Sequence, residues 1–263
     1  MIARKKTFDF DVNFKEAMSF YRSFGFCVFR NIYKKNNFEP IFKKIEQITN
    51  SQLDNLITSK DFKKKQSIDK KIVFLQKKND LFRKNLYDVM QGFPETTNLG
   101  LNKKIYKVAK FLNIKVPILR TSQIRMDLPK DRRFLIPPHQ EVKGIRSPNM
   151  IFFISAMRDI NNNMGSLNLS PGSFLLNSLM PKTSDKNKYQ FVDKKIYKKY
   201  PLIFFPLLAG ETILLNMNTI HGSRSNISQK IRWSSIVRIE DAQSMPHLIK
   251  LDSSFIEKYD LKG

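Results

Sequence analysis

Residues 210–235 read GETILLNMNTIHGSRSNISQKIRWSS, two apolar runs joined by a polar segment that carries His221. The run at 211–216 and the run at 231–239 are short and rich in β-branched residues, so each is predicted to be a strand. Alternate residues of a strand face the same way. Arg232 and Ser234 therefore share one face of the second strand, and Ile231, Trp233 and Ser235 take the other.

A second histidine lies upstream, in the motif His139-Gln140-Glu141. Side chains at positions i and i+2 of an extended segment point the same way, so His139 and Glu141 could bind one ion together. Two imidazoles and one carboxylate are the ligand set of a non-haem Fe(II) oxygenase, and they leave the opposite face of the metal open for a cosubstrate and O₂. The chain has three histidines, and His221 is the candidate for the second imidazole. His139, Glu141 and His221 are thus predicted metal ligands.

The composition is that of a folded protein. Hydrophobic residues make up 41% and aromatic residues 12% of 263, which is enough for a substantial core. Cys27 is the single cysteine, which excludes an intramolecular disulfide and a cysteine-based zinc site. The N-terminus lacks the apolar stretch of a secretory signal, and the longest apolar run is far shorter than the ~18 residues of a spanning helix. We expect a soluble, cytoplasmic protein.

The net charge of +24 permits several kinds of partner: nucleic acid, an anionic membrane surface or acidic small molecules. The lysine clusters at 63–65, 70–71 and 103–104 lack interleaved aromatic residues. They are typical of solvated helix faces. We therefore attribute most of the charge to scattered surface lysines, and a nucleic-acid partner is not the favoured interpretation.

The predicted elements run from helices to strands. Residues 13–22 and much of 38–112 have apolar residues at helical spacing, with a break at Gly92-Phe93-Pro94, and residues 25–30 form a short buried strand. Further strands are predicted at 118–128, 149–156 (buried on both faces), 166–169 and 201–208, and the lysine-rich residues 174–200 are a candidate flap. This order favours an α+β fold with a β-sandwich or barrel core. We expect one domain over 1–263: a mainly helical part to about 115, a strand core over about 116–240 and a tail over 241–263.

Three segments in order resemble the phytanoyl-CoA dioxygenase family of Fe(II)/2-oxoglutarate-dependent oxygenases. GSLNLSPGS at 165–173 resembles its NG-x-L-x-x-x-PGSH stretch. GETILL at 210–215, with HGS at 221–223 and then Asn226, Ser228 and Arg232, resembles its GD…HGS-x-x-N-x-S-x-x-x-R run. FGFCVF at 24–29 is similar to its N-terminal GF/GY-V-V strand. The resemblance covers about residues 16–240.

The resemblance implies a double-stranded β-helix (jelly-roll or cupin-like) core and dependence on Fe(II), 2-oxoglutarate and O₂. It implies that His139, Glu141 and His221 bind the iron and that Arg232 holds the distal carboxylate of 2-oxoglutarate. A guanidinium offers a carboxylate two parallel N–H donors, which agrees with that role. Ser234 could add a hydroxyl donor. Gln123 and Arg125, on one face of the strand before the metal motif, are candidates for binding the C1 carboxylate or the substrate.

Two positions depart from the family pattern. Glu141 stands where the family commonly has aspartate, and its extra methylene moves the carboxylate although oxygen remains the ligand atom. Phe174 stands where the PGSH stretch ends in histidine, which concerns loop packing or substrate rather than the metal.

The leading hypothesis is a hydroxylase acting on a small metabolite that is anionic or linked to a carrier. The basic flap and the basic residues around the metal motif would suit such a substrate: Lys130, Arg132, Arg133, Lys143 and Arg146. One alternative is a non-catalytic binding protein on the same fold, with nucleic acid as a candidate ligand; another is an oxygenase acting on a protein or nucleic acid. A non-catalytic relative would be expected to lose a metal ligand or Arg232, and all four positions are present.

Overall fold

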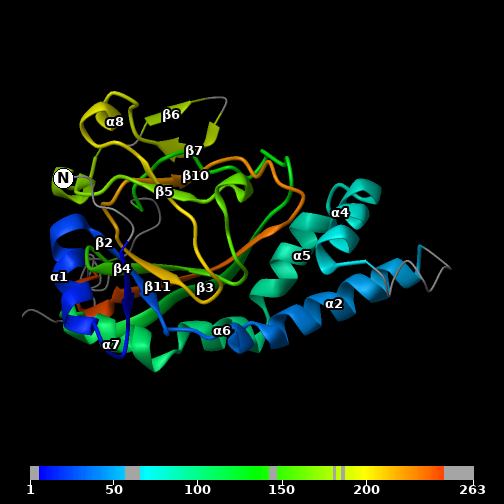
Figure 1. The fold of residues 1–263 in the computed structure, drawn as a ribbon, viewed down its shortest axis with the longest axis horizontal. Coiled ribbons are helices and arrows are strands. Elements are labelled where there is room, and N and C mark those ends of the chain that lie inside the picture. The colour runs from blue at the N-terminus through cyan, green and yellow to red at the C-terminus, as the bar shows by residue number, and fades with distance from the viewer. Residues whose placement is uncertain (1–5, 57–65, 142–146, 180–181, 185–186, 246–263) are drawn as a thin grey trace, which may run out of the picture.

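The computed structural model describes residues 6–56, 66–141, 147–179, 182–184 and 187–245 (Figure 1). Two β-sheets pack face to face, and helices cover the outer side of the larger sheet. This is the α+β arrangement with a jelly-roll core that the sequence predicted. Among the described helices, none has both the length and the apolar character needed to cross a membrane.

The larger sheet contains six strands in the order β1-β2-β9-β4-β11-β3. Its neighbours are antiparallel except for β1 and β2, which are parallel. The strands are β1 (Thr7–Asp9), β2 (Phe26–Arg30), β3 (Pro117–Asp127), β4 (Met150–Ala156), β9 (Thr212–Asn216) and β11 (Arg232–Asp241). The smaller sheet has the order β10-β5-β8, from β5 (Leu167–Leu169), β8 (Ile203–Phe205) and β10 (His221–Ser223).

The strands of the larger sheet divide their side chains between two cores. On β4, Ile151 and Phe153 pack with the helices, whereas Phe152 and Ile154 point between the two sheets. All seven residues of β4 are buried, which confirms the prediction of a strand buried on both faces. The same alternation on β11 places Trp233 against the helices and Ile236 between the sheets. The space between the sheets is where the candidate site lies.

The helices of the N-terminal half form two groups in Figure 1. One group lies under the larger sheet: α1 (Phe14–Phe24), α6 (Pro94–Gly100) and α7 (Lys103–Phe111). The other extends beyond the sheets to one side: α2 (Glu39–Asp54), α4 (Ile68–Lys78) and α5 (Phe82–Gln91). The predicted break at Gly92-Phe93-Pro94 is confirmed, because α5 ends at Gln91 and α6 begins at Pro94.

Short elements account for the main differences from the sequence prediction. The parallel strand β1 was not expected, and the candidate flap contains the hairpin β6 (Lys182–Ser184) and β7 (Asn187–Phe191) followed by α8 (Ile196–Lys199). One predicted strand, 201–208, is only the three residues of β8. Residues 63–65, Lys143, Arg146 and the tail beyond 245 lie outside the described residues.

The interpretation of the lysine clusters as solvated is wrong for Lys71. Its side chain is 3% exposed because α4 packs on α2. The Lys71 ammonium donates to Glu46 Oε1 at 3.1 Å and to Asn50 Oδ1 at 2.9 Å, both on α2. A buried ammonium requires such partners. Lys70 and Lys103 are exposed, as expected.

Candidate active site

The two histidines are brought together by an isolated antiparallel bridge between residue 139 and β10. The His139 amide donates to the His221 carbonyl and the His221 amide to the His139 carbonyl, each at 2.9 Å. The neighbouring Gly222 permits this approach, because a Cβ there would lie 2.9 Å from the Pro138 nitrogen. Glu141 is fixed by its amide, which donates to the Met217 carbonyl at 2.9 Å.

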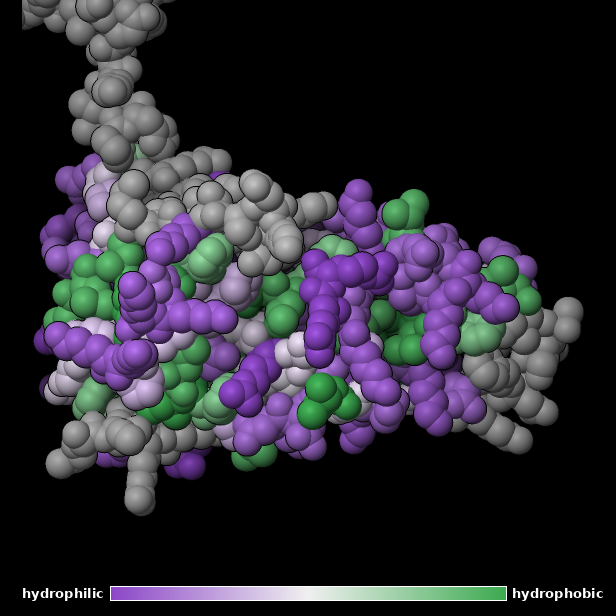
Figure 2. Space-filling view, turned by 90° about the horizontal axis from the view of Figure 1, so that it is seen from above, coloured by the Kyte–Doolittle hydropathy of each residue, from purple (hydrophilic) through white to green (hydrophobic). Residues whose placement is uncertain are grey.

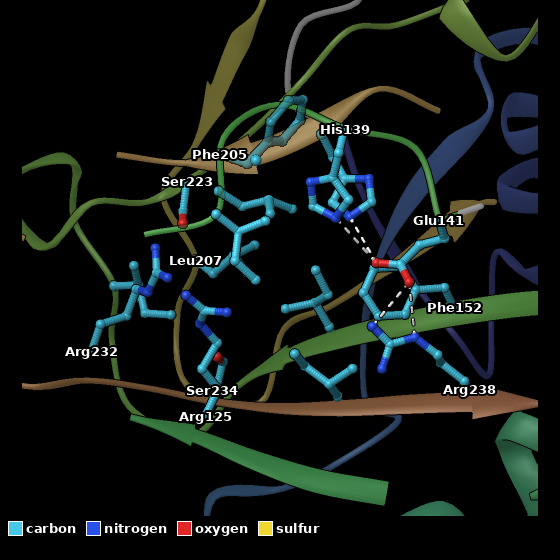
Figure 3. A pocket seen from close by; sticks show the side chains of 17 residues that line it. Arg125, His139, Glu141, Phe152, Phe205, Leu207, Ser223, Arg232, Ser234 and Arg238 are labelled. Carbon is cyan, nitrogen blue, oxygen red and sulfur yellow. Dashed lines mark hydrogen bonds and ion pairs between the residues drawn. The ribbon is translucent and has the colours of Figure 1, made fainter. Parts of the chain in front are cut away.

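The three predicted ligands converge on one point (Figure 3). Nε2 of His139 and Nε2 of His221 each lie 3.4 Å from Glu141 Oε1. The Nδ1 atoms face backbone carbonyls, that of His139 at 2.8 Å from Pro137 O and that of His221 at 2.9 Å from Thr219 O. An N–H at Nδ1 that donates to a backbone carbonyl leaves the lone pair on Nε2, which is the nitrogen that can then bind a metal. The donor set therefore fits a divalent metal with open positions.

Electrostatics keep these groups in the forms that bind metals. Burial raises the pKa of Glu141, but hydrogen bonds with both histidines and the charge of Arg238 outweigh it and hold that pKa well below its usual value. Burial, together with the nearby His139, lowers the pKa of His221. A carboxylate and a neutral imidazole are thus present near neutral pH, as metal binding requires.

Arg238 holds the other oxygen of Glu141 and was not singled out from the sequence. Its Nε and Nη2 lie 3.1 and 3.0 Å from Glu141 Oε2, so Oε1 is left to face the histidines. The guanidinium also lies over the Phe152 ring at 4.6 Å and donates to Thr121 Oγ1 at 3.3 Å. Alternation along β11 was the available signal, because Arg238 is six residues after Arg232. The longer glutamate side chain brings its carboxylate within reach of this arginine.

Arg232 lies at the far end of the same cavity from Glu141 (Figure 3). Its Nε and Nη2 donate to Asp127 Oδ2 at 3.1 and 2.7 Å, and its Nη1 donates to the Gly165 carbonyl. Asp127 is shared, because Arg125 Nε and Nη2 also donate to its carboxylate. Burial raises the pKa of Asp127, but Arg232 and Arg125 outweigh it and hold that pKa well below its usual value. One carboxylate thus orients two arginines.

The other predicted residues are divided between two cavities. Ser234 lines the cavity of the histidines beside Arg125 and Arg232, as the strand alternation predicted. Gln123 does not line it; it lies in an adjoining cavity, where its Oε1 accepts a hydrogen bond from the Tyr87 hydroxyl at 3.2 Å. Ser223, two residues after His221 on β10, lines the histidine cavity and was not predicted. Apolar side chains form most of the remaining wall: Ile136, Phe152, Ile154, Ile160, Leu167, Phe205, Leu207 and Ile236.

Asn226 orders the turn that follows β10. Its Oδ1 accepts from the Ser228 amide at 3.0 Å, and its Nδ2 donates to the carbonyls of Lys230 at 2.7 Å and Asp127 at 3.0 Å. The loop between β10 and β11 is therefore tied to the end of β3 next to the shared carboxylate.

Gly165→Ala is expected to destabilise the fold at the Arg232 contact. Gly165 has φ +71°, and a Cβ there would lie 2.2 Å from the Arg224 carbonyl oxygen. We expect a loss of at least about 2 kcal/mol in the free energy of unfolding, measured by urea denaturation. The matched control is Gly92→Ala, where φ is −80° and the nearest atom is 3.5 Å away, and where no loss is expected. Equal stability of the two variants would contradict the role given to Gly165.

Asp127→Asn is expected to lower the free energy of unfolding by about 3 kcal/mol at neutral pH, because it leaves two arginines without their carboxylate. The pKa of Asp127 is lower in the folded protein than in the unfolded chain, where it is ~3.9. The ionised carboxylate therefore stabilises the fold above that pH, and this contribution is lost as the pH falls toward the folded-state pKa. The difference in free energy of unfolding between wild type and variant should be constant from about pH 5 to 7. Below ~3.9 it should shrink by up to about 1.4 kcal/mol per pH unit. Urea denaturation at several pH values measures it; a difference that persists unchanged at pH 3 would show that Asp127 does not act through its charge.

Comparison with known proteins agrees with this geometry. A family model described as phytanoyl-CoA dioxygenase matches residues 21–234. The chain belongs to the phytanoyl-CoA dioxygenase family. It is therefore an iron- and 2-oxoglutarate-dependent oxygenase, an enzyme that uses O₂. No curated protein sequence matches the chain.

Solved structures show the same fold at low sequence identity. The epimerase SnoN, in complex with Fe³⁺, α-ketoglutarate and nogalamycin RO, is 15% identical over 93% of this chain and 92% of that chain, with a TM-score of 0.61. The non-haem α-ketoglutarate-dependent carbocyclase SnoK is 16% identical over 94% of each chain, with a TM-score of 0.56. AviO1 from Streptomyces viridochromogenes is 15% identical over 88% of this chain and 96% of that chain, with a TM-score of 0.53. These likenesses show that the chain has the same fold as these three proteins.

Proposed function

We propose that His139, Glu141 and His221 bind Fe(II), that Arg232 binds the distal carboxylate of 2-oxoglutarate, and that the enzyme hydroxylates a C–H bond of a small anionic molecule. The observation that carries the proposal is the layout of one cavity. Two imidazole Nε2 atoms and one carboxylate oxygen converge at one end, and a buried guanidinium lies at the other (Figure 3). A ligand with a chelating head and a distal carboxylate matches that layout.

Arg232 has donors left for a ligand. A guanidinium carries five N–H groups. The hydrogen bonds of Arg232 to Asp127 and Gly165 use one N–H on each of its three nitrogens, so two N–H groups remain. The hydroxyls of Ser223 and Ser234 line the same cavity and can add donors to the same carboxylate.

When bound, iron with 2-oxoglutarate and O₂ would supply the oxidising chemistry: one oxygen atom would enter the substrate, the other would enter succinate, and CO₂ would be released. The chain supplies orientation and a dry environment. The carbonyls of Pro137 and Thr219 fix the two imidazole rings, and Arg238 fixes the carboxylate of Glu141. The apolar wall between the sheets excludes water from the reacting groups.

The charge of the cavity supports an anionic substrate. Three guanidinium groups, those of Arg125, Arg232 and Arg238, face two carboxylates, those of Asp127 and Glu141. The site therefore has one positive charge when the histidines are neutral. Fe(II) adds two positive charges and the 2-oxoglutarate dianion removes two, so one positive charge remains for the substrate. Such a residual field favours an anion over a neutral analogue.

Substrate-dependent release of succinate tests the proposed function. Purified protein with Fe(II), 2-oxoglutarate and ascorbate would be incubated with a panel of small carboxylates and phosphate esters, each paired with its neutral methyl ester or free alcohol. We expect anionic members to stimulate succinate release and their neutral partners to do so at least about tenfold less, with His221→Ala inactive. Stimulation by the neutral members alone would contradict the anionic class.

The alternative function, a basic binding protein, lacks a comparable observation. On the face seen in Figure 2, hydrophilic residues extend along the molecule with hydrophobic ones between them. Within the described part of the flap, Lys182 is paired with Asp193 at 2.5 Å, and Lys194 and Lys195 are exposed. A filter-binding titration with nucleic acid distinguishes the two functions, since a nucleic-acid protein would bind with a steep dependence on salt.

A further inference from the structure

A second cavity adjoins the one that contains the histidines. Its walls come from α5, which packs on β3, from β3 and β11 themselves, and from the loop that leads to His139. Arg125, Ile136, Ile236 and Arg238 line both cavities. A molecule in the second cavity would therefore lie against the same four side chains that border the metal ligands.

The second cavity is cationic. Arg83 and Lys84 of α5 join Arg125 and Arg238 in its lining, and its single acidic residue is the exposed Asp88. Arg125 and Arg238 already have carboxylate partners in Asp127 and Glu141. The charges of Arg83 and Lys84 remain to be balanced, since no ion pair of either forms within the described part of the chain.

Arg83 is the informative residue, because it is buried and forms no direct ion pair with a described residue. It is 5% exposed, its Nη2 donates to the Met126 carbonyl at 2.8 Å, and its guanidinium lies 3.5 Å from the centre of the Phe134 ring. Its Nε has no hydrogen-bond partner among the described residues. Burial lowers the pKa of Arg83, partly offset by Asp127 and Asp131. A buried guanidinium with an unused N–H is costly unless a ligand pairs with it.

Neutral donors accompany Arg83. Gln123 accepts from the Tyr87 hydroxyl through Oε1, and its Nε2 makes no hydrogen bond to a described residue. The Tyr87 and Phe134 rings give the cavity aromatic surface beside these donors. An oxyanion next to an apolar or aromatic group would therefore find both charge and contact area.

We propose that the second cavity is the substrate subsite and that Arg83, with Gln123, binds a carboxylate or phosphate group of the substrate while the rest of the molecule reaches the metal between Arg125 and Arg238. The inference rests on the proposed function, and it names a place for the anionic group that the proposed function leaves open. Specificity would then be set by α5, outside the jelly-roll core.

The probes for this subsite are sulfate, which represents a phosphate group, and acetate, which represents a carboxylate. Nitrogen-15-labelled protein with Zn(II) in place of Fe(II) and saturating 2-oxoglutarate would be titrated with each at constant ionic strength. The arginine Nε–H resonance missing from Arg83→Met identifies Arg83. We expect this resonance to shift saturably with at least one probe. Saturation by sulfate alone assigns a phosphate, saturation by acetate alone assigns a carboxylate, and saturation by both assigns a site for either oxyanion.

Three variants make the titration decisive. Gln123→Met, at a half-buried position, keeps Arg83 and is expected to weaken probe binding at least tenfold. Because calorimetry measures this binding without a resonance assignment, the test stands even if Arg83→Met fails to fold. Arg22→Met is the matched control, because Arg22 also lies over a phenylalanine, Phe111 at 5.0 Å, but on α1 and in neither cavity. Its binding should equal that of wild type. A linear shift without saturation, or equal binding by Gln123→Met and Arg22→Met, would overturn the proposal.

The failure of this inference can be told from the failure of the proposed function. The visible absorption band of Fe(II) with 2-oxoglutarate reports the proposed cosubstrate site and is measured separately. If the protein shows the band but binds neither probe, the subsite is wrong and the proposed function stands. If the protein binds a probe but shows no band, the proposed function is wrong, and the cavity then has no role in binding a substrate.

Discussion

Glu141→Ala is expected to lower the affinity for Fe(II) by more than about 100-fold and to abolish turnover. Loss of a residue that merely orients a metal ligand costs about 10- to 100-fold, so loss of the carboxylate itself should exceed that range. Glu141 is also the one acidic member of the group, and its Oε1 lies 3.4 Å from both imidazole Nε2 atoms. Removing it leaves two neutral ligands, so the ion loses one of its three protein ligands and the only negative charge among them.

Three further variants separate metal binding from folding in this prediction. Glu141→Gln keeps the size of the side chain and removes its charge, so it should lose most of the metal affinity while retaining the fold. Glu141→Asp keeps the charge but withdraws it from Arg238, so an intermediate affinity is expected. Glu95→Ala is the control, because Glu95 pairs with Lys44 at 2.7 Å on the helical side of the molecule. Anaerobic titration with Fe(II) measures all four; wild-type affinity in Glu141→Ala would exclude this carboxylate as a ligand.

Arg232→Met is expected to lower the affinity for 2-oxoglutarate about 100-fold, with a smaller effect on the affinity for Fe(II). A charge-assisted hydrogen bond contributes about 1.5–3 kcal/mol, and two such bonds to one carboxylate exceed the ~2.8 kcal/mol that corresponds to 100-fold. Arg232 lies at the end of the cavity away from the metal ligands, so the metal set should stay intact (Figure 3). The dissociation constant for 2-oxoglutarate, measured without O₂, is the appropriate quantity.

Arg232→Lys and Arg224→Met complete this test. Lysine keeps the charge and loses the paired N–H geometry, so its affinity should fall between wild type and Arg232→Met. Arg224 is an exposed neighbour that lies over the Phe204 ring at 3.9 Å, and its loss should leave 2-oxoglutarate binding unchanged. If Arg232→Met binds 2-oxoglutarate as wild type does, the distal carboxylate must sit elsewhere in the cavity.

The sequence predicted what local spacing determines. His139 and Glu141 are two residues apart in an extended segment, and Arg232 and Ser234 alternate on one strand, so the structure places each pair as the pattern required. Arg238 follows from the same alternation, because it lies within the predicted strand 231–239 and an even number of residues after Arg232.

The register between distant strands could not be predicted from the sequence. Asp127 stands opposite Arg232, and Arg125 opposite Ser234, only because β3 pairs with β11 in that register. The shared carboxylate therefore could not be assigned from spacing, although Asp127 alternates with Arg125 along the same strand. Lys71 likewise became buried through the packing of α4 on α2, a contact that composition does not reveal.

The most direct test of the site is an anaerobic titration of the protein with Fe(II) and 2-oxoglutarate, followed by the weak visible absorption band of their complex. His139, Glu141 and His221 with Arg232 across the cavity predict a band that saturates at one equivalent of iron in wild type and in Glu95→Ala. Glu141→Ala and His221→Ala should lose it. A well-folded wild-type protein that gives no band with both components present would contradict the proposed site.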